Sequence, residues 1–168
     1  MDLGSVATMQ PLACAYFMTD KIELIRQRAV AVRATLERAR DAEADIQWIS
    51  RFPEACCNFA ANLLIIQLSA VGIRGLRRMI GAIRDDDGND IASHVWVVVD
   101  GSILVDITAD SHGLDNVIVA SQSGWHASLC DVRPFIERID HEDGISEGEV
   151  QRLQNLYKDT LCVLEEFK

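Results

Sequence analysis

The sequence predicts an α+β fold in which two helices precede a small antiparallel sheet and a further helix follows it. Apolar residues recur every three or four positions from Lys21 to Ala42 and again near the C-terminus, which is the period of amphipathic helices. Between these helices lie apolar, β-branched segments separated by turn residues, which is typical of strands. The length of 168 residues and the 49% hydrophobic content fit one domain spanning residues 1–168.

The first long helix is expected within residues 19–45. Its apolar positions include Ile22, Ile25, Ala29, Val32 and Leu36, and arginines and glutamates fill the positions between them. The same spacing is compatible with a dimer seam, so this helix is also the expected surface for a protein partner. Because about three heptads with alanine at core positions make a weak coiled coil, we favour packing against its own domain.

A second helix is expected to begin just after Pro53. Residues 57–71 are too long and too uniformly apolar for a strand, which predicts a helix buried on most sides that ends at Gly72.

Three strands follow this helix in the prediction. The last two are joined by Asp100-Gly101, which is a strong hairpin signal, and the first two by the loop DDDGND. Residues 116–120 are a candidate fourth strand, and residues 125–129 fit either a helix or a strand. The three predicted strands are Gly75–Ile83, Ile91–Val99 and Ser102–Thr108.

The C-terminal part is predicted to be helical. A short helix is expected after Pro134, and a longer one at residues 146–166, where Ser146 and Glu149 have the spacing of a capping box.

Composition excludes several classes of function. The formal charge of −10, from 26 acidic and 16 basic residues, repels phosphate backbones, so we expect no nucleic-acid partner. No glycine-rich phosphate loop follows a predicted strand, and no cofactor is expected. The first twenty residues have neither the basic region nor the apolar run of a signal peptide or membrane span, and five cysteines without framework-like spacing fit reduced thiols. These features predict a cytoplasmic protein without membrane contact.

Cys57 is the candidate nucleophile because it falls in the first turn of the second helix. Unpaired backbone N–H groups and the positive end of the helix dipole favour a thiolate there, by roughly 0.3–1 kcal/mol. The remaining activation of such a thiol normally comes from an imidazole that a carboxylate orients. Cys56 is the alternative nucleophile.

His94 and Asp106 are the candidate imidazole and carboxylate. Each interrupts an apolar strand, and the two strands are predicted neighbours. Pairing them about Asp100-Gly101 brings together residues whose numbers sum to roughly 201, so His94 lies near Asp106 and a one-residue bulge would align the two. Both side chains are then expected on the sheet face against which the Cys57 helix packs.

The order of Cys57, His94 and Asp106 resembles the transglutaminase core of the papain-like cysteine enzymes. CNFAANLL, followed by VGI and then Gly81, is similar to that family's Cys-x-x-Ala helix and Gly-Ile ending. HVWVVV and VDIT resemble its His-x-Trp-Val strand and its Asp-x-Thr strand end. The resemblance covers about residues 52–110 and implies a papain-like fold, with the nucleophile-bearing helix packed on a small antiparallel sheet and flanking amphipathic helices at both termini.

The resemblance implies an acyl-enzyme mechanism on an amide, peptide, isopeptide or related acyl bond. Cys57 would attack the carbonyl carbon, His94 would relay the proton and Asp106 would orient His94. Cys57 is preferred over Cys56 because the Cys-x-x-Ala spacing starts there. The chain has Ala55-Cys56 where the family often has a glycine, and Asn58 where it often has glycine or arginine, so the resemblance names no side-chain donor for the oxyanion hole.

A second hypothesis is a non-catalytic interaction module on the same fold, for example a partner or immunity protein in a bacterial toxin system. The acidic surface suits a basic partner. His112, His126 and His141 fall in loop-like contexts with no ligand spacing to Cys130 or to one another, so no metal site is predicted.

Overall fold

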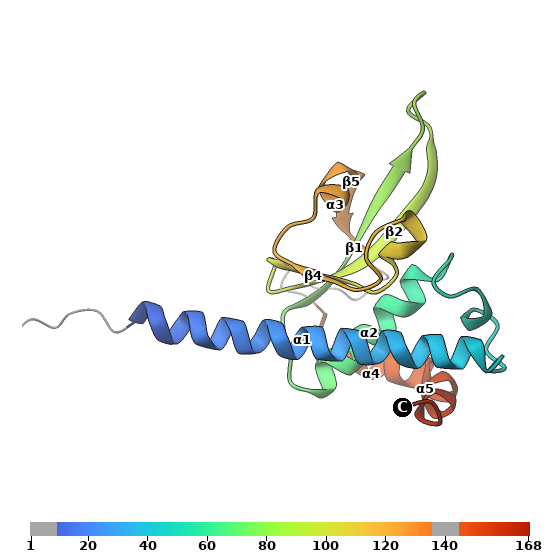
Figure 1. Cartoon of the computed structure of the whole chain (residues 1–168), viewed down its shortest axis with the longest axis horizontal. Helices are drawn as coiled ribbons and strands as arrows, with labels where there is room; N and C mark the ends of the chain where they lie inside the picture. Colours follow the sequence, from blue (N-terminus) through green and yellow to red (C-terminus); the bar gives the residue numbers. More distant parts are fainter. Residues whose placement is uncertain (1–9, 136–144) are drawn as a thin grey trace, which may run out of the picture.

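The computed structural model describes residues 10–135 and 145–168, and the side chains from residue 20 onward within these ranges apart from that of Glu149. It has the expected α+β architecture, with a five-stranded antiparallel sheet and several helices (Figure 1). The helices are α1 (Gln10–Asp41), α2 (Cys57–Ala70), α3 (Gly124–Ser128), α4 (Glu147–Leu156) and α5 (Lys158–Glu165). The strands are β1 (Leu76–Arg84), β2 (Asp90–Val99), β3 (Ile103–Asp106), β4 (Ile118–Ala120) and β5 (Cys130–Pro134). Two short 3₁₀ helices lie at Ile49–Arg51 and Ala109–His112.

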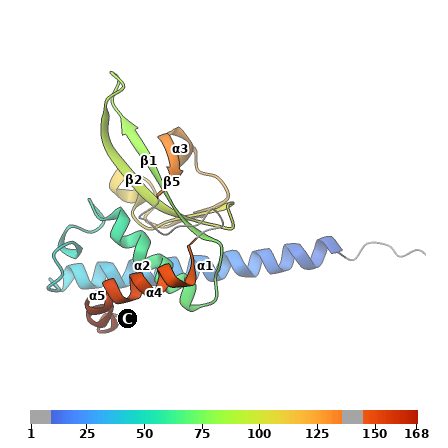
Figure 2. The same ribbon diagram turned by 180° about the vertical axis from the view of Figure 1, so that it is seen from behind.

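The sheet has the order β4-β3-β2-β1-β5, and all of its pairs are antiparallel. The long β1–β2 hairpin rises above the rest of the molecule in Figures 1 and 2. Its loop is the DDDGND segment, where Asp85 Oδ1 accepts the backbone N–H of Asn89 at 2.8 Å. The expected hairpin at this position is confirmed.

The register between β2 and β3 differs by one from the predicted register. Val97 pairs with Val105 and Val99 with Ile103, so paired numbers sum to 202, as in 97 + 105, and not to 201. Asp100 and Gly101 both have positive φ, and the N–H of Ser102 bonds to the carbonyl of Val99, which leaves one more residue in the connection than expected. His94 and Asp106 share a face in this register without a bulge between the strands.

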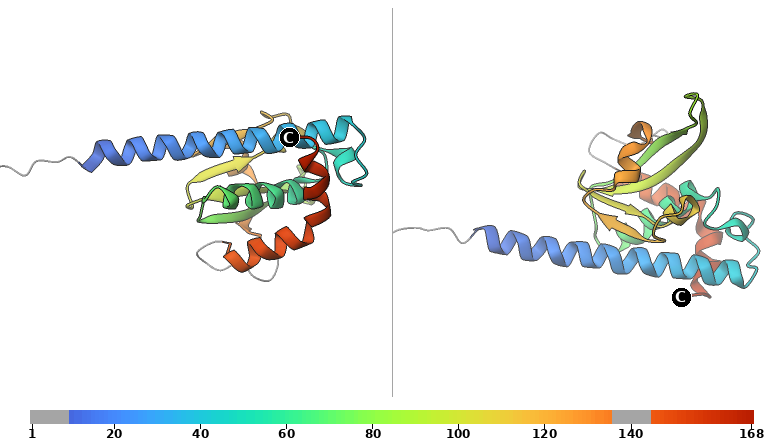
Figure 3. Two further views of the ribbon diagram at one scale, coloured as in Figure 1. Left: turned by 90° about the horizontal axis from the view of Figure 1, so that it is seen from below. Right: turned by 45° about the horizontal axis from the view of Figure 1, so that its top comes forward.

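The helices α1, α2 and α4 lie side by side beneath the sheet, as the view from below shows (Figure 3, left). The apolar side of α2 fills the space between this layer and the sheet, with Leu63, Leu64 and Ile65 buried. On β2 and β3 the side chains that face α2 are Val95, Val97 and Val105, which belong to the same core. His94, Trp96 and Asp106 alternate to the opposite face, on which α3 lies, so they do not share the α2 face as expected. Only the first residue of α2, Cys57, reaches His94, and its thiol also faces the backbone N–H of Val95.

Several element boundaries also differ from the prediction. Helix α1 already includes Gln10, the first residue that the structure describes, so it extends further toward the N-terminus than the predicted range of 19–45. The single C-terminal helix expected at 146–166 is two helices that meet at Tyr157, whose hydroxyl accepts a hydrogen bond from Asn62 Nδ2 on α2 at 3.1 Å. The ambiguous residues 125–129 belong mostly to α3, and β5 was not predicted.

Two predictions fall on parts that the structure does not describe. The short helix expected after Pro134 would lie mainly in residues 136–144, and the Glu149 side chain of the proposed capping box is outside the described side chains. No helix in the described ranges is both long and apolar enough to cross a membrane.

Candidate active site

Cys57 is the first residue of α2, and its side chain is half-buried. This position places the sulfur among the free N–H groups of the first helical turn, as the sequence predicts. The thiol also faces the backbone N–H groups of Asn58 and Val95. It therefore lies against β2 next to His94.

Cys56 has a different environment from its neighbour. It is buried, its Sγ lies 3.2 Å from the carbonyl oxygen of Pro53, and burial raises the pKa of its thiol to about 12. A thiol with such a pKa is protonated at neutral pH and is a poor nucleophile. The structure therefore separates the two adjacent cysteines and favours Cys57 as the reactive one.

His94 is held between Cys57 and Asp106. Its Nε2–H donates to Asp106 Oδ2 at 2.6 Å, and both side chains are only 1% exposed. The other ring nitrogen, Nδ1, is the atom left for the hydrogen bond with the Cys57 thiol. The structure thus brings Cys57, His94 and Asp106 together, with His94 between the other two, as predicted.

The charges of this group favour a thiolate beside an imidazolium. Burial by itself raises the pKa of Cys57, but the hydrogen bond and charge of His94 outweigh burial and bring this pKa below its ordinary value. Burial likewise lowers the pKa of His94, but Asp106 and Cys57 outweigh it and raise the pKa to about 9. Near neutral pH the proton therefore rests on His94.

Asp106 accepts more hydrogen bonds than a simple orienting carboxylate needs. The backbone N–H and hydroxyl of Thr108 donate to Oδ1 at 2.8 and 3.1 Å, and both His94 and His126 donate to Oδ2. Burial alone raises the pKa of Asp106, but these donors outweigh it and hold the pKa well below its usual range. The carboxylate is therefore ionised and fixed in orientation.

His126 is a member of this group that the sequence interpretation missed. It lies on α3, its Nε2 contacts Asp106 Oδ2 at 2.9 Å, and its Nδ1 contacts Ser123 Oγ at 2.8 Å. The sequence around His126 reads as a loop because its five-residue helix is too short to show a helical pattern. The Ser-x-x-His spacing, which places both groups on one turn, was the only local signal.

Gly81 on β1 lets this helix come close to the sheet. It pairs directly with His94, and a Cβ built on it would lie 2.7 Å from Cβ of Leu129, just after α3. Any side chain at this position would push α3, and His126 with it, away from Asp106.

Aromatic rings cover His94 on the face opposite α2. His112 and Trp125 stack on each other at 4.7 Å, and each meets the His94 ring edge-on, at 4.9 and 5.2 Å between centroids. Trp96 lies 6.2 Å from His94 on the same strand. Burial and the charge of His94 lower the pKa of His112, so a second positive charge beside the imidazolium is disfavoured.

Arg33 of α1 contacts both the segment before Cys57 and the segment after Asp106. Its guanidinium lies over the Phe52 ring at 4.6 Å, shortly before Cys57, and donates to the carbonyl of Ile107 at 2.8 Å, just after Asp106. It also forms a bidentate pair with Asp110, with both N–O distances 2.7 Å. This buried arginine fixes the spacing between the nucleophile segment and the carboxylate segment.

His94, Asp106 and His126 also have the residue types of a metal site. One ligand atom of each lies within 4.8 Å of the others. The contacts of 2.6 and 2.9 Å are hydrogen-bond lengths, whereas ligands about 2.0–2.1 Å from a tetrahedral zinc ion are more than about 3 Å apart. The side chains as arranged therefore fit shared protons better than a shared metal ion.

The two other cysteines whose side chains the structure describes, Cys130 and Cys162, are not among the residues of this group. Cys130 is the first residue of β5, Cys162 is exposed on α5, and among the described side chains all four cysteines are free thiols.

The chain matches no protein-family model, no curated protein and no solved structure.

His126 is expected to be a positioning residue for Asp106. His126→Ala removes one donor from a buried carboxylate, so Asp106 stabilises the His94 imidazolium less well and the pKa of Cys57 rises. We expect alkylation of Cys57 by iodoacetamide at neutral pH to slow by about tenfold. His126→Gln, which keeps an N–H donor, is expected to recover part of the rate.

Ser123→Ala is the matched control, because it removes only the contact on the far side of the His126 ring. A purely structural His126 would lower thermal stability on substitution by alanine but leave the pH profile of Cys57 alkylation unchanged, and that result contradicts the prediction.

Proposed function

We propose that the chain is a cysteine hydrolase or acyl transferase of the papain-like, transglutaminase-core type. One observation carries the proposal: a buried imidazole, His94, contacts a carboxylate through Nε2 at 2.6 Å and lies close enough to the thiol of Cys57 to lower the pKa of that thiol. A nucleophile and a base in contact, with the base oriented by a third group, is the arrangement that activates a thiol.

The surrounding elements support this assignment. The nucleophile opens a buried helix, and the imidazole and carboxylate lie on successive antiparallel strands. The Asp-x-Thr segment ends β3 with a turn in which Thr108 holds Asp106. These features belong to residues 52–110, the part for which the sequence resembles the transglutaminase core.

The proposed reaction begins with the Cys57 thiolate and the His94 imidazolium. The sulfur forms a bond to the carbonyl carbon of an amide or thioester, and the carbonyl electron pair moves to oxygen. When that oxyanion collapses, the bond to the leaving group breaks, and His94 gives its Nδ1 proton to the departing nitrogen or sulfur. The product is a thioester between the substrate acyl group and Cys57.

The second half-reaction uses His94 as a base. Neutral His94 takes a proton from water or from an amine, whose oxygen or nitrogen attacks the thioester carbonyl and releases the thiolate. Water gives hydrolysis, and an amine gives acyl transfer. The backbone N–H of Cys57, at the positive end of α2, is the proposed donor to the oxyanion.

The substrate is expected to approach the exposed side of Cys57. The internal void that Cys57 shares with Val95 and Val105 has no room for a water molecule, so the acyl group enters from the surface.

The test is the pH dependence of iodoacetamide alkylation, followed at each cysteine by mass spectrometry. Cys57 is expected to be alkylated rapidly at pH values where exposed Cys162 reacts slowly, because its pKa is lowered. In His94→Ala the burial of Cys57 persists while the imidazolium is lost. The pKa of Cys57 then rises above its ordinary value, and fast alkylation disappears from the neutral range.

One result of this experiment would support the proposal and another would contradict it. An acid-shifted profile for Cys57 alone, removed by His94→Ala, supports a thiolate–imidazolium pair. If Cys57 follows the profile of Cys162 in both proteins, the three residues are not a catalytic group.

One observation favours a second candidate, the non-catalytic interaction module. His94 is 1% exposed beneath Trp96, His112 and Trp125, and such packing is also what a structural histidine has. That candidate predicts an unreactive Cys57 together with one tightly bound basic protein in an affinity purification.

A further inference from the structure

A hydroxyl and an imidazole on α3 form a second possible nucleophile–base pair. The Oγ of Ser123 lies 2.8 Å from Nδ1 of His126, and Nε2 of His126 lies 2.9 Å from Oδ2 of Asp106. A hydroxyl in contact with an imidazole that a carboxylate orients is the arrangement of a Ser-His-Asp triad. Such a triad is recognised by its geometry and not by the order of its residues in the chain.

The protons of this group are arranged for attack by the hydroxyl. Asp106 is ionised, and a carboxylate can only accept hydrogen bonds, so Nε2 of His126 carries the proton of that contact. In the neutral ring Nδ1 then has a lone pair, and the Ser123 hydroxyl donates to it. This is the tautomer in which a histidine can act as a general base toward a serine.

The hydroxyl of Ser123 is not used to cap α3. Ser123 is the N-cap residue of this helix, and a serine there usually accepts a hydrogen bond from the first turn through its side chain. The Ser123 side chain makes no such bond, and it is the backbone carbonyl that accepts, from the N–H of Ala127 at 3.0 Å. Helix capping therefore does not account for the contact between the hydroxyl and His126.

Ser123 and His126 both line a cavity of about 490 Å³ on the α3 face of the sheet. Ser123 is half-buried, and a Cβ built on Gly124, the next residue, would meet no other part of the chain within 4 Å. A ligand therefore has room beside the hydroxyl. Apolar side chains from four strands form much of the remaining wall, which suits an apolar group of a ligand. They are Met79 of β1, Val98 of β2, Leu104 of β3 and Val132 of β5.

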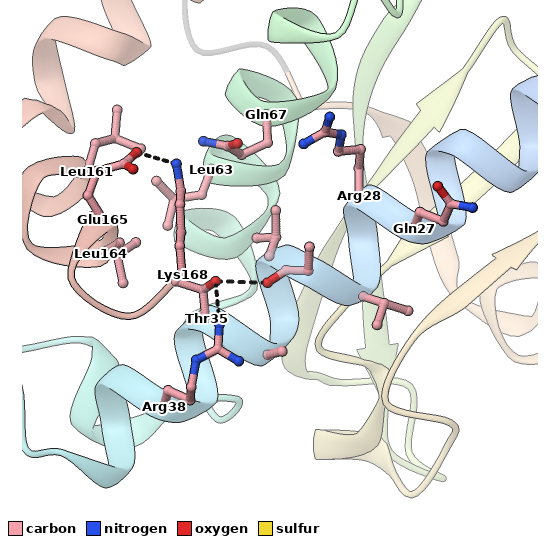
Figure 4. A pocket seen from close by; sticks show the side chains of 14 residues that line it. Gln27, Arg28, Thr35, Arg38, Leu63, Gln67, Leu161, Leu164, Glu165 and Lys168 are labelled. Atoms are coloured by element: carbon pink, nitrogen blue, oxygen red, sulfur yellow. Dashed lines mark hydrogen bonds and ion pairs between the residues drawn. The ribbon is translucent and has the colours of Figure 1, made fainter.

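A larger cavity elsewhere in the protein has no such pair. It measures about 580 Å³ and lies between α1, α2 and α5, where Glu165 and Lys168 on its wall pair with each other (Figure 4). The described residues that line it include no serine, cysteine or histidine. The cavity beside α3, in contrast, joins an apolar wall to a nucleophile and a base.

We propose that Ser123, His126 and Asp106 form a second catalytic group, which hydrolyses small esters with an apolar acyl part. This activity is additional to the proposed function of Cys57, and it uses neither Cys57 nor His94. An ester is the expected substrate because an alcohol is a better leaving group than an amine.

The proposed reaction begins with attack by the Ser123 oxygen on the ester carbonyl carbon, while the hydroxyl proton passes to Nδ1 of His126. The bond between the carbonyl carbon and the alcohol oxygen then breaks, and the alcohol leaves with that proton. Water next gives a proton to His126 and attacks the acyl-serine, and the acid leaves as Ser123 takes the proton back. The side-chain amide of Gln122, which lines the same cavity, is available as a donor to the oxyanion.

The first test is labelling of the full chain by an alkyl fluorophosphonate, with the modified residue located by mass spectrometry. An activated serine oxygen attacks phosphorus, fluoride leaves, and the proton passes to the base. We expect Ser123 to be labelled at neutral pH and Ser123→Ala to lose the label. Ser128→Ala is the matched control, because Ser128 is on the same helix and its Oγ donates to the carbonyl of Trp125. Absence of label on Ser123, or labelling of Ser123 no faster than of Ser128, overturns the proposal.

The second test measures hydrolysis of p-nitrophenyl butanoate after treatment with iodoacetamide, which blocks Cys57. The rate is expected to fall at least about tenfold in Ser123→Ala, because the nucleophile is lost, and to persist in Ser128→Ala. Equal rates in wild type and Ser123→Ala would show that Ser123 does not hydrolyse esters and would overturn the proposed activity.

The serine group and the Cys57 group can fail separately, because labelling and alkylation are read at different residues of the same protein. An unlabelled Ser123 beside a Cys57 with acid-shifted alkylation overturns the serine group alone. A labelled Ser123 beside a Cys57 that reacts like Cys162 supports the serine group and contradicts the proposed function of Cys57.

Discussion

Cys57→Ala is expected to remove both turnover and rapid alkylation while leaving the fold intact. The substitution deletes the only atom that forms the proposed thioester, so no acyl-enzyme accumulates, and loss of the nucleophile in such a group costs about 10⁶-fold in kcat. Alanine at the first position of a helix is well tolerated, and Cys57 is only half-buried, so the unfolding temperature should change little.

Two matched substitutions separate this effect from general thiol chemistry. Cys56→Ala alters the adjacent buried thiol, whose pKa is about 12, and should leave the alkylation of Cys57 largely unchanged. Cys162→Ser removes an exposed thiol on α5. If Cys56→Ala abolishes fast alkylation and Cys57→Ala does not, the nucleophile is Cys56 and the proposed geometry is wrong.

Local pattern was sufficient to predict the elements that position the three candidate residues. The uniformly apolar run from Cys57 and the alternating strand around His94 are long enough for their periods to be recognised, and both elements lie where expected. The register was predicted less well. The connection after Val99 has one residue more than a two-residue turn, and this depends on how Ser102 bonds, which the Asp-Gly signal does not specify.

The unpredicted parts of the site depend on tertiary contacts. His126 reaches Asp106 only because β5 returns to pair with β1 and brings α3 over the sheet, and no local pattern around His126 specifies that path. The helical pattern places the arginines of this helix between its apolar positions, but Arg33 is buried because Asp110, Glu37 and the Ile107 carbonyl together satisfy its charge. The sequence shows that position 33 carries a positive charge, but it does not show which groups pair with that charge.

The second large effect is expected from Asp106→Asn. The substitution keeps the shape of the side chain but removes the charge that stabilises the His94 imidazolium. Thr108 donates two hydrogen bonds to Oδ1, so the asparagine oxygen is expected to take that position and turn its NH₂ group toward His94 and His126. His94 must then accept at Nε2 and carry its proton on Nδ1.

An imidazole with its proton on Nδ1 has no lone pair to offer the Cys57 thiol. The same change in a serine triad lowers kcat by about 10⁴-fold through the wrong tautomer, and we expect a comparable loss of turnover here. Alkylation of Cys57 at neutral pH should slow by at least about tenfold, because the thiol regains the high pKa that burial alone imposes.

Stability gives an independent readout of the same carboxylate. The pKa of Asp106 is lowered by folding, so its contribution to stability is present above the ordinary pKa of a carboxyl group and is lost as pH falls through the lower folded value. Wild type should therefore lose stability in acid over a range in which Asp106→Asn loses less, while Asp87→Asn, at an exposed hairpin tip, should match wild type. An Asp106→Asn protein with a wild-type alkylation profile would show that His94 activates Cys57 without this carboxylate, and Asp106 would then be a structural residue of the β3 end.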